Sequence, residues 1–259
     1  MEEEVGGPGS DLAWRVERAC FHAWPALHQV EVGDWVARAG AGLTRRNNSA
    51  NPLRPDARLT EVAIAACESL YDGWGLRRCF RLPGFLPPET DRLLERCGYA
   101  QEADTTTLFG QIPEVAAADP SGTVWSRPEP PWLNAKAGLS ELKADEAATY
   151  RSVLETLTVP AGFAGVTHDG VLASVAYGAI YDRLLCLEGV VTRRDLRGQG
   201  LGRRMLMTLF AWARDRGAEA VCLQVESGNA SAVSLYRSLG LRRDLYHYHY
   251  RRWPSAEQI

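Results

Sequence analysis

Three glycines and the arginines beside them form the stretch of this sequence that is best suited to chemistry. The run from Arg197 to Arg203 reads Arg-Gly-Gln-Gly-Leu-Gly-Arg and follows an apolar, β-branched segment, residues 187–192, that predicts a strand. Residues 203–213 then place apolar side chains at helical spacing. Glycines let backbone N–H groups approach a phosphate, and a helix N-terminus adds about half a positive charge. The spacing therefore predicts a cradle for an anion.

Three motifs use such a cradle, and the residues after the glycines separate them. A P-loop ends on Gly-Lys-Ser/Thr, whereas Gly202 is followed by two arginines. A dinucleotide fingerprint needs G-x-G-x-x-G, but Arg203 stands where the third glycine belongs. The pattern Arg197-x-x-Gly200-x-Gly202 instead resembles the R/Q-x-x-G-x-G/A motif of the GNAT superfamily of N-acetyltransferases. In isolation these glycines could form an ordinary tight turn; their place between a strand and a helix favours the motif.

A second stretch downstream resembles the next motif of the same superfamily. Residues 220–225 predict a strand, and residues 226–241 place Asn229 before a helix and Tyr236 one turn before a glycine stop. Both motifs occur in the family's order within residues 187–251. The chain is therefore identified by resemblance as a GNAT, and acetyl-coenzyme A is the co-substrate that this resemblance implies.

The resemblance implies a role for each of these residues. The loop amides would hold the pyrophosphate of acetyl-coenzyme A, the backbone of residues 190–192 would pair with its pantetheine arm, and the Val190 N–H would polarise the thioester carbonyl. Asn229 would contact the cofactor arm, cap its helix, or do both. The implied cofactor-binding residues are Val190, Val191, Thr192, Arg197, Gly198, Gln199, Gly200, Leu201, Gly202, Arg203 and Asn229.

Two side chains are candidates for proton transfer. Tyr236 corresponds to the general acid of the family, which protonates the departing thiolate, although a core tyrosine on a helix face is the alternative. Glu188 lies on the predicted strand of the oxyanion donor, where many GNAT members carry a glutamate. It could act as a general base through water, bind the ammonium group of the acceptor, or be a structural acid.

Composition limits the remaining possibilities. The 259 residues are 46% hydrophobic and 24% charged with a formal charge of −3, which gives no electrostatic reason to expect nucleic acid as a partner. No apolar run reaches the length of a membrane span. The six cysteines form no C-x-x-C pair, so we expect buried reduced thiols and a cytoplasmic protein. His247 and His249 could ligate zinc, but an amphipathic final strand is the favoured interpretation, and we expect no metal.

The halves of the sequence resemble each other weakly. Residues 79–82, 92–99 and 43–47 echo residues 222–225, 234–241 and 191–195, at offsets of 143, 142 and 148. The first half lacks the glycine loop after Thr44 and has Leu94 in the place of Tyr236. We therefore predict an α+β fold of two GNAT-like domains, each a twisted mixed, largely antiparallel sheet flanked by helices. The predicted segments are a flexible leader (1–10), a degenerate GNAT-like domain (11–111), a proline-rich linker (112–139) and a catalytic GNAT domain (140–259).

The expected activity is acetyl-coenzyme A-dependent N-acetyl transfer to a primary amine by direct attack in a ternary complex. A non-catalytic sensor that binds coenzyme A and a transferase of longer acyl groups are the alternatives. The acceptor is a small-molecule or peptide amine whose identity the residues do not specify, because one fold serves many substrates. The inactive first half would be a platform or one wall of the acceptor site, in a monomer or a homodimer.

Overall fold

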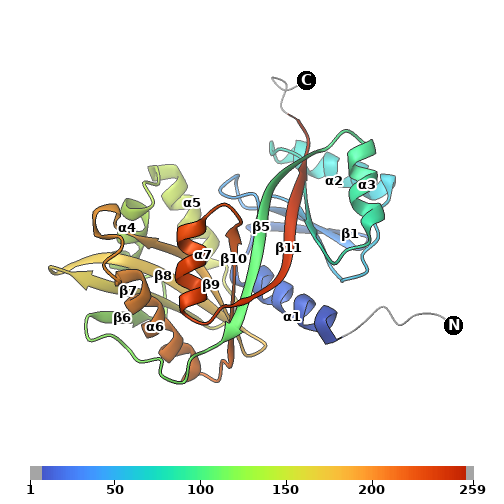
Figure 1. Ribbon diagram of the computed structural model, residues 1–259. Coiled ribbons are helices and arrows are strands. Elements are labelled where there is room, and N and C mark those ends of the chain that lie inside the picture. Colours follow the sequence, from blue (N-terminus) through green and yellow to red (C-terminus); the bar gives the residue numbers. More distant parts are fainter. Residues whose placement is uncertain (1–7, 255–259) are drawn as a thin grey trace.

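The computed structural model describes residues 8–254, and its strands form one continuous mixed sheet with helices on both faces (Figure 1). The predicted mixed α/β class is confirmed. In the first half the elements are α1 (Pro8–Ala23), β1 (His28–Val32), β2 (Trp35–Ala39), β3 (Ala50–Pro52), α2 (Glu61–Gly73), β4 (Cys79–Pro83), α3 (Pro88–Arg96) and β5 (Ala100–Gln111). In the second half they are β6 (Gly122–Trp125), α4 (Pro130–Leu139), α5 (Ala144–Glu155), β7 (Ala161–His168), β8 (Val171–Tyr181), β9 (Leu184–Thr192), a 3₁₀ turn (Arg194–Leu196), α6 (Leu201–Arg214), β10 (Ala220–Glu226), α7 (Ala230–Ser238) and β11 (Arg243–Arg252).

Alternation along the strands explains how the sheet carries helices on both faces. On β9, Leu185 and Leu187 pack in the cluster that includes α6 and α7, while Leu184 and Cys186 face the cluster that includes α1. Phe80 of β4 belongs to the cluster under α2 and α3. Successive side chains of a strand point to opposite faces, so these apolar runs are buried on both sides.

The two halves exchange strands at the centre of the sheet. The strand order is β1-β2-β3-β4-β11-β5-β10-β9-β8-β7-β6, so β11 lies between β4 and β5, and β5 lies between β11 and β10. Both strands are long and run through the junction of the two lobes in Figure 1. The sheet therefore continues without a break across the boundaries predicted at residues 111 and 140.

Several sequence predictions need correction. Residues 112–139 were expected to be a linker, but they include β6 and α4, and Trp132 is fully buried with its Nε1 donating to the Ala164 carbonyl at 2.9 Å. The prolines misled the prediction because proline at the first turn begins a helix instead of breaking it. Residues 43–47, matched in the sequence to residues 191–195 at the end of β9, lie instead in the loop between β2 and β3, so the third repeat match does not join equivalent elements. The leader was predicted to reach residue 10, but α1 begins at Pro8, and residues 1–7 lie outside the described part of the chain.

The final strand is amphipathic, as the alternation of its residues predicts. Tyr246, Tyr248 and Tyr250 are buried, whereas His247 contacts the Thr106 hydroxyl at 3.1 Å and His249 contacts an Asp91 oxygen at 2.8 Å. Arg251 is 5% exposed and forms an ion pair with the same aspartate. Its placement on a strand that crosses the centre of the sheet accounts for this burial.

Helix α1 is fixed to β4 and β11 by a buried ionic group. Glu17 is paired with Arg81 of β4 and accepts a hydrogen bond from the Tyr246 hydroxyl at 2.5 Å. Glu17 and Arg81 are 4% and 1% exposed. The arginine lowers the pKa of Glu17 against the opposing effect of burial.

Within residues 8–254, none of the helices is long and apolar enough to cross a membrane.

The strand exchange predicts that the second half cannot fold alone. A fragment of residues 140–259 loses β5, which pairs with β10 from Ala220 to Glu226 and also borders β11. We expect this fragment to lack cooperative unfolding in circular dichroism, because two strand edges and their apolar faces stay open. Fragments 1–118 and 119–259, which divide the chain in a loop, should associate and unfold cooperatively when they are produced together. A cooperative transition of the 140–259 fragment alone would contradict the interdependence of the halves.

Candidate active site

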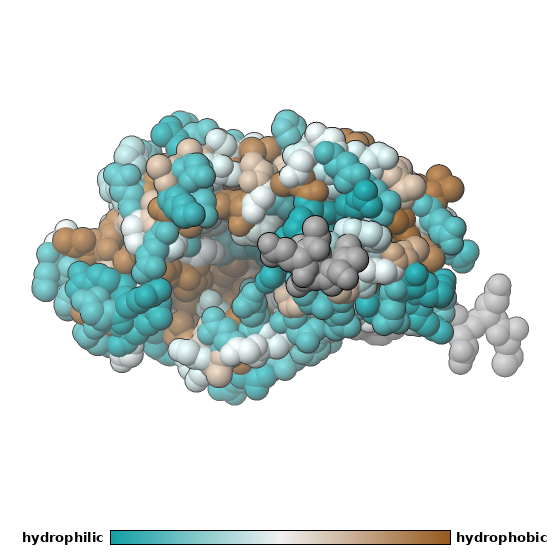
Figure 2. Space-filling model, turned by 90° about the horizontal axis from the view of Figure 1, so that it is seen from above, coloured by the Kyte–Doolittle hydropathy of each residue, from teal (hydrophilic) through white to brown (hydrophobic). Residues whose placement is uncertain are grey.

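Strands β9 and β10 run parallel and then separate, which opens a cleft in the sheet. They pair only over residues 184–186 and 220–222. Beyond Cys186 and Cys222 a cleft of about 750 Å³ begins, lined by residues of β9, the glycine loop, β10 and α7. Figure 2, which views the molecule from above, shows a hollow with hydrophobic side chains on its walls near the middle of this face. The β9 edge in the cleft is free to bind an extended substrate as an added strand.

A bulge in β9 lies at the inner end of the cleft. Tyr177 of β8 stands opposite Glu188 and Val175 stands opposite Val191, so Gly189 and Val190 together oppose a single residue. Gly189 has φ +62°, and a Cβ there would lie 2.7 Å from the Tyr150 hydroxyl oxygen. Both the backbone angle and the close approach require glycine.

The predicted cradle is present at the start of α6. Gly198 and Gly200 have φ of +78° and +80°, and no atom lies within 4 Å of a Cβ built on either residue. Gly200 is the N-cap, and no side chain caps the helix, so the N–H groups of its first turn are open to a ligand. Arg197 folds back to donate to the Thr192 carbonyl at 3.3 Å, and Arg203 donates to the Ser238 carbonyl at 3.2 Å. This loop fits a diphosphate.

The structure brings nearly all the sequence-predicted residues to the cleft. Val190, Val191, Thr192, Arg197, Gly198, Gly200, Leu201, Gly202, Arg203, Asn229, Glu188 and Tyr236 all line it, whereas Gln199 does not. Asn229 is the N-cap of α7, and its Oδ1 accepts from the Ala232 N–H at 3.2 Å. Tyr236 is 7% exposed, and burial raises its pKa to about 12, so the hydroxyl keeps its proton at neutral pH.

A second cavity, of about 360 Å³, meets the cleft at Glu188, Gly189, Gln224 and Glu226. Its walls come from both halves of the chain and are rich in aromatic side chains. The first half supplies Trp24, Thr44, Arg45, Arg46 and Thr105; the second supplies Lys136, Tyr150, Tyr177, Tyr248 and Tyr250. Sequence reasoning expected the first half to form a platform or a wall, and it does form one wall of this cavity.

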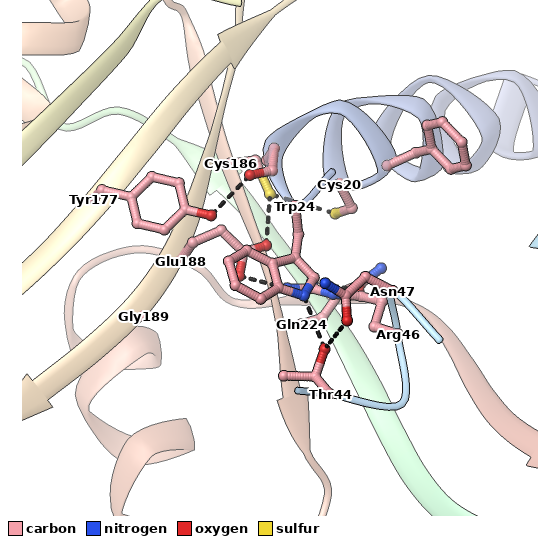
Figure 3. Close-up of polar contacts among 12 residues, drawn as sticks. Cys20, Trp24, Thr44, Arg46, Asn47, Tyr177, Cys186, Glu188, Gly189 and Gln224 are labelled. Atoms are coloured by element: carbon pink, nitrogen blue, oxygen red, sulfur yellow. Dashed lines mark hydrogen bonds and ion pairs between the residues drawn. The ribbon is translucent and has the colours of Figure 1, made fainter. Parts of the chain in front are cut away.

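Glu188 is held by an arginine from the opposite half. Its Oε2 lies 2.5 Å from Nη2 of Arg46, whose Nη1 donates to the Gln224 side chain at 2.8 Å (Figure 3). The side chains of Glu188 and Arg46 are 9% and 16% exposed. Burial raises the pKa of Glu188, and the arginine opposes that shift. The arginine therefore favours the charged form of this carboxylate through a contact across the two halves.

Sequence reasoning missed Arg46 and Lys136. Arg46 lies in the loop between β2 and β3, where no local pattern marks a contact with a residue 142 positions away. Lys136 lies in α4, inside the segment predicted as a linker, and donates from Nζ to the Gly189 carbonyl at 3.0 Å. The presence of α4 could have been recognised from Pro130 and Pro131 followed by a run without helix breakers. Its contact with β9 depends on the tertiary fold.

Three cysteines meet behind Glu188, in the apolar cluster between α1 and the sheet. The sulfur atoms of Cys20, Cys186 and Cys222 lie within 4.8 Å of one another, and all three residues are buried. Cys20 and Cys186 are 3.5 Å apart at sulfur (Figure 3). They are free thiols, as the sequence predicts. The expectation that the protein uses no metal stays a prediction.

The ion pair between Arg46 and Glu188 predicts that replacing Arg46 destabilises the protein much more than replacing the adjacent Arg45. Arg46→Met leaves the Glu188 carboxylate buried without its partner, and we expect a loss of about 3–5 kcal/mol in the free energy of unfolding. Arg45→Met is the matched control, because its pair with Glu226 has side chains 37% and 69% exposed. Loss of such a pair should change stability by no more than about 1 kcal/mol. Urea unfolding of both variants measures the difference, and equal losses would contradict the assigned role of Arg46.

Comparisons with known proteins agree with this geometry. The family model described as "Probable histone acetyltransferase Rv0428c C-terminal" matches residues 13–253. The chain is 25% identical over 243 residues to the uncharacterized N-acetyltransferase YobR of Bacillus subtilis, covering 92% of this chain and 97% of that protein.

Two solved structures share the fold. A GCN5-related N-acetyltransferase from Kribbella flavida superposes with a TM-score of 0.70 at 18% identity, covering 98% of both chains. A tandem GNAT protein from the clavulanic acid biosynthesis pathway superposes with a TM-score of 0.59 at 14% identity, covering 86% of this chain and 78% of the other. The matched family model covers most of the chain, and the glycine loop and the separated strands β9 and β10 agree with it. The chain therefore belongs to the GNAT superfamily of N-acetyltransferases.

Proposed function

We propose that this chain transfers the acetyl group of acetyl-coenzyme A to a primary amine, which attacks the thioester directly while both substrates are bound. The observation that carries the proposal is the junction of the two cavities. The cleft with the glycine cradle and the aromatic cavity share Glu188 and Gly189. A thioester lying along β9 would thus meet an amine entering from the second cavity without either substrate leaving its own site.

The cradle would hold the diphosphate, and the β9 edge would hold the pantetheine arm. Backbone N–H groups at Gly198–Gly202 and the N-terminus of α6 supply positive potential without a mobile side chain. The backbone of residues 190–192 has no strand partner on the side that faces β10, so it continues as a free strand edge toward the bulge. These two elements support acetyl-coenzyme A as the co-substrate.

The chemical step moves three protons. The acceptor amine, with a pKa near 10.4 in water for a lysine-like group, must lose one proton before its nitrogen attacks the thioester carbon. Once the carbon–nitrogen bond has formed, that nitrogen gives up a second proton to water, the carbon–sulfur bond breaks, and the thiolate sulfur takes a proton. Tyr236, which is protonated across the physiological range, supplies that proton as general acid.

Glu188 is proposed to receive the proton of the amine through water, or to hold the ammonium group before it is lost. Its position at the junction and its raised pKa support either role. Arg46 occupies one carboxylate oxygen, Oε2, at 2.5 Å. The other oxygen, Oε1, accepts a weak hydrogen bond from the Cys186 thiol at 3.7 Å.

The first half is proposed to be a degenerate copy of the second. The succession of β4, α3 and β5 repeats as β10, α7 and β11, and the last strand of each half inserts beside the other. Leu94 lies in α3 at the position of Tyr236 in α7, so the first half has no acid at that place. It contributes Arg46 and the Trp24 side chain to the acceptor cavity instead.

Tyr236→Phe tests the proposed chemistry. We expect kcat to fall by about 10²–10⁴-fold, because the thiolate then leaves without its proton, while the Kd for acetyl-coenzyme A stays unchanged. A screen of small amines and peptides for coenzyme A release identifies an acceptor and gives kcat for the wild-type protein and the variant. Calorimetry of both proteins then gives the Kd for acetyl-coenzyme A. A sensor would bind the cofactor and show no turnover in either protein. Mass spectrometry of the bound cofactor would identify a longer acyl group.

If the glycine loop holds the cofactor, a substitution at Gly200 should weaken cofactor binding, whereas the same substitution at Gly217 should not. Gly200→Ala strains a backbone at φ +80° and moves the N–H groups of the first turn of α6, so we expect acetyl-coenzyme A to bind about 10-fold more weakly. Gly217→Ala imposes the same strain at φ +83° beyond the other end of α6. Calorimetric titration with coenzyme A measures the Kd of each of the two variants. Equal weakening in the two variants would contradict cofactor binding at this loop.

A further inference from the structure

Lys136 contacts the β9 bulge from α4, a helix that lies outside the two sequence motifs described above. It is 8% exposed, and its Nζ donates to the Gly189 carbonyl at 3.0 Å. A lysine near a surface normally extends its ammonium group to water. The ammonium group of Lys136 instead points into the protein, at the single glycine that forms the β9 bulge.

The carbonyl that Lys136 contacts belongs to a peptide group with a second function. The Gly189 C=O and the Val190 N–H form one planar trans unit, so fixing one end fixes the direction of the other. The positively charged ammonium group beside the carbonyl oxygen also draws electron density away from the peptide nitrogen. The Val190 N–H thereby becomes a stronger hydrogen-bond donor. Gly189 and Val190 lie outside the regular register with β8, so the strand pairing itself does not hold this peptide.

We infer that Lys136 is a positioning residue that holds the Gly189–Val190 peptide and strengthens the Val190 N–H as the donor to the thioester carbonyl. The inference rests on the proposed acetyl transfer, in which that N–H stabilises the developing oxyanion. It gives the β6–α4 region, absent from the two sequence motifs, a direct part in the reaction.

The surroundings of Lys136 fit a fixed role. Trp132, one turn earlier in α4, is fully buried and anchors the helix to β7. The Tyr150 ring of α5 lies 5.5 Å from the Lys136 ammonium, and its hydroxyl packs against Gly189. Glu188, the nearby carboxylate, is paired with Arg46. The ammonium group therefore acts on the peptide and is not neutralised in an ion pair with that carboxylate.

The charge of Lys136 is titratable in an accessible range. Burial lowers its pKa to about 8, against the opposing effect of Glu188. The charge is present below that pH and lost above it. The other titratable groups that line the cavity with Lys136 are Tyr150 on α5, Tyr177 on β8, Glu188 on β9, Glu226 on β10, Tyr248 and Tyr250 on β11, and Arg45 and Arg46 from their loop. Burial raises the pKa of Tyr150 and Tyr177, and Arg46 stays charged.

The test uses the carbonyl stretching band of [1-¹³C]acetyl-coenzyme A bound to the full chain, which reports polarisation without an acceptor. In the wild-type complex we expect the band below its position in water, and we expect it to move back as pH rises through about 8. Lys136→Met should remove most of the shift at pH 7. Lys136→Arg should keep the shift and remove its alkaline dependence, because arginine stays charged.

Kinetics give the second readout. With any acceptor that is turned over, Lys136→Met should lower kcat by about 10–100-fold, in the range expected when an oxyanion donor is misplaced. The Kd for acetyl-coenzyme A should change by less than about threefold. The chain has only two lysines, so Lys143→Met, at an exposed position, is the matched control and should equal wild type.

The outcomes separate this inference from the proposed function. If acetyl-coenzyme A binds and its carbonyl band is the same in wild type and Lys136→Met, the role of Lys136 is overturned while acetyl transfer stands. If acetyl-coenzyme A does not bind the wild-type chain, the proposed function itself fails.

Discussion

The structure depends on a strand edge that the protein leaves unpaired. Buried backbone N–H and C=O groups need partners, and β9 loses its partner on one side where β10 diverges beyond Cys186 and Cys222. The edge stays open because β10 is bound on its other side by β5, a strand from the first half. A substrate that can add as a strand satisfies the exposed groups, so the strand exchange and the cleft are consequences of one arrangement.

The same arrangement explains why the two halves share one site. Exchange of β5 and β11 brings the loop with Arg46 against Glu188 and places Tyr248 and Tyr250 on the wall of the second cavity. A carboxylate buried to 8% exposure on β9 needs a compensating charge, and the first half supplies it. The first half is therefore required for the electrostatics of the site even though it lacks a cradle and an acid of its own.

Local patterns in the sequence predicted the parts of the site that lie within one segment. The spacing of Gly200 and Gly202 fixes the turn and the helix start, and the order of Asn229 and Tyr236 fixes one helix, so both motifs could be read directly. Arg46 and Lys136 could not be found in this way, because each acts through a contact 142 or 53 residues away along the chain. The strand exchange was equally hidden, since a strand of alternating residues does not specify its neighbour.

We propose that acetyl-coenzyme A lies along the β9 edge with its diphosphate at the start of α6. Hydrogen–deuterium exchange of the backbone amides, measured with and without acetyl-coenzyme A, tests this placement. We expect slower exchange at residues 190–192 and 198–203 and little change on the outer strands β1 and β2. Protection confined to another part of the chain, or none at saturating cofactor, would contradict it.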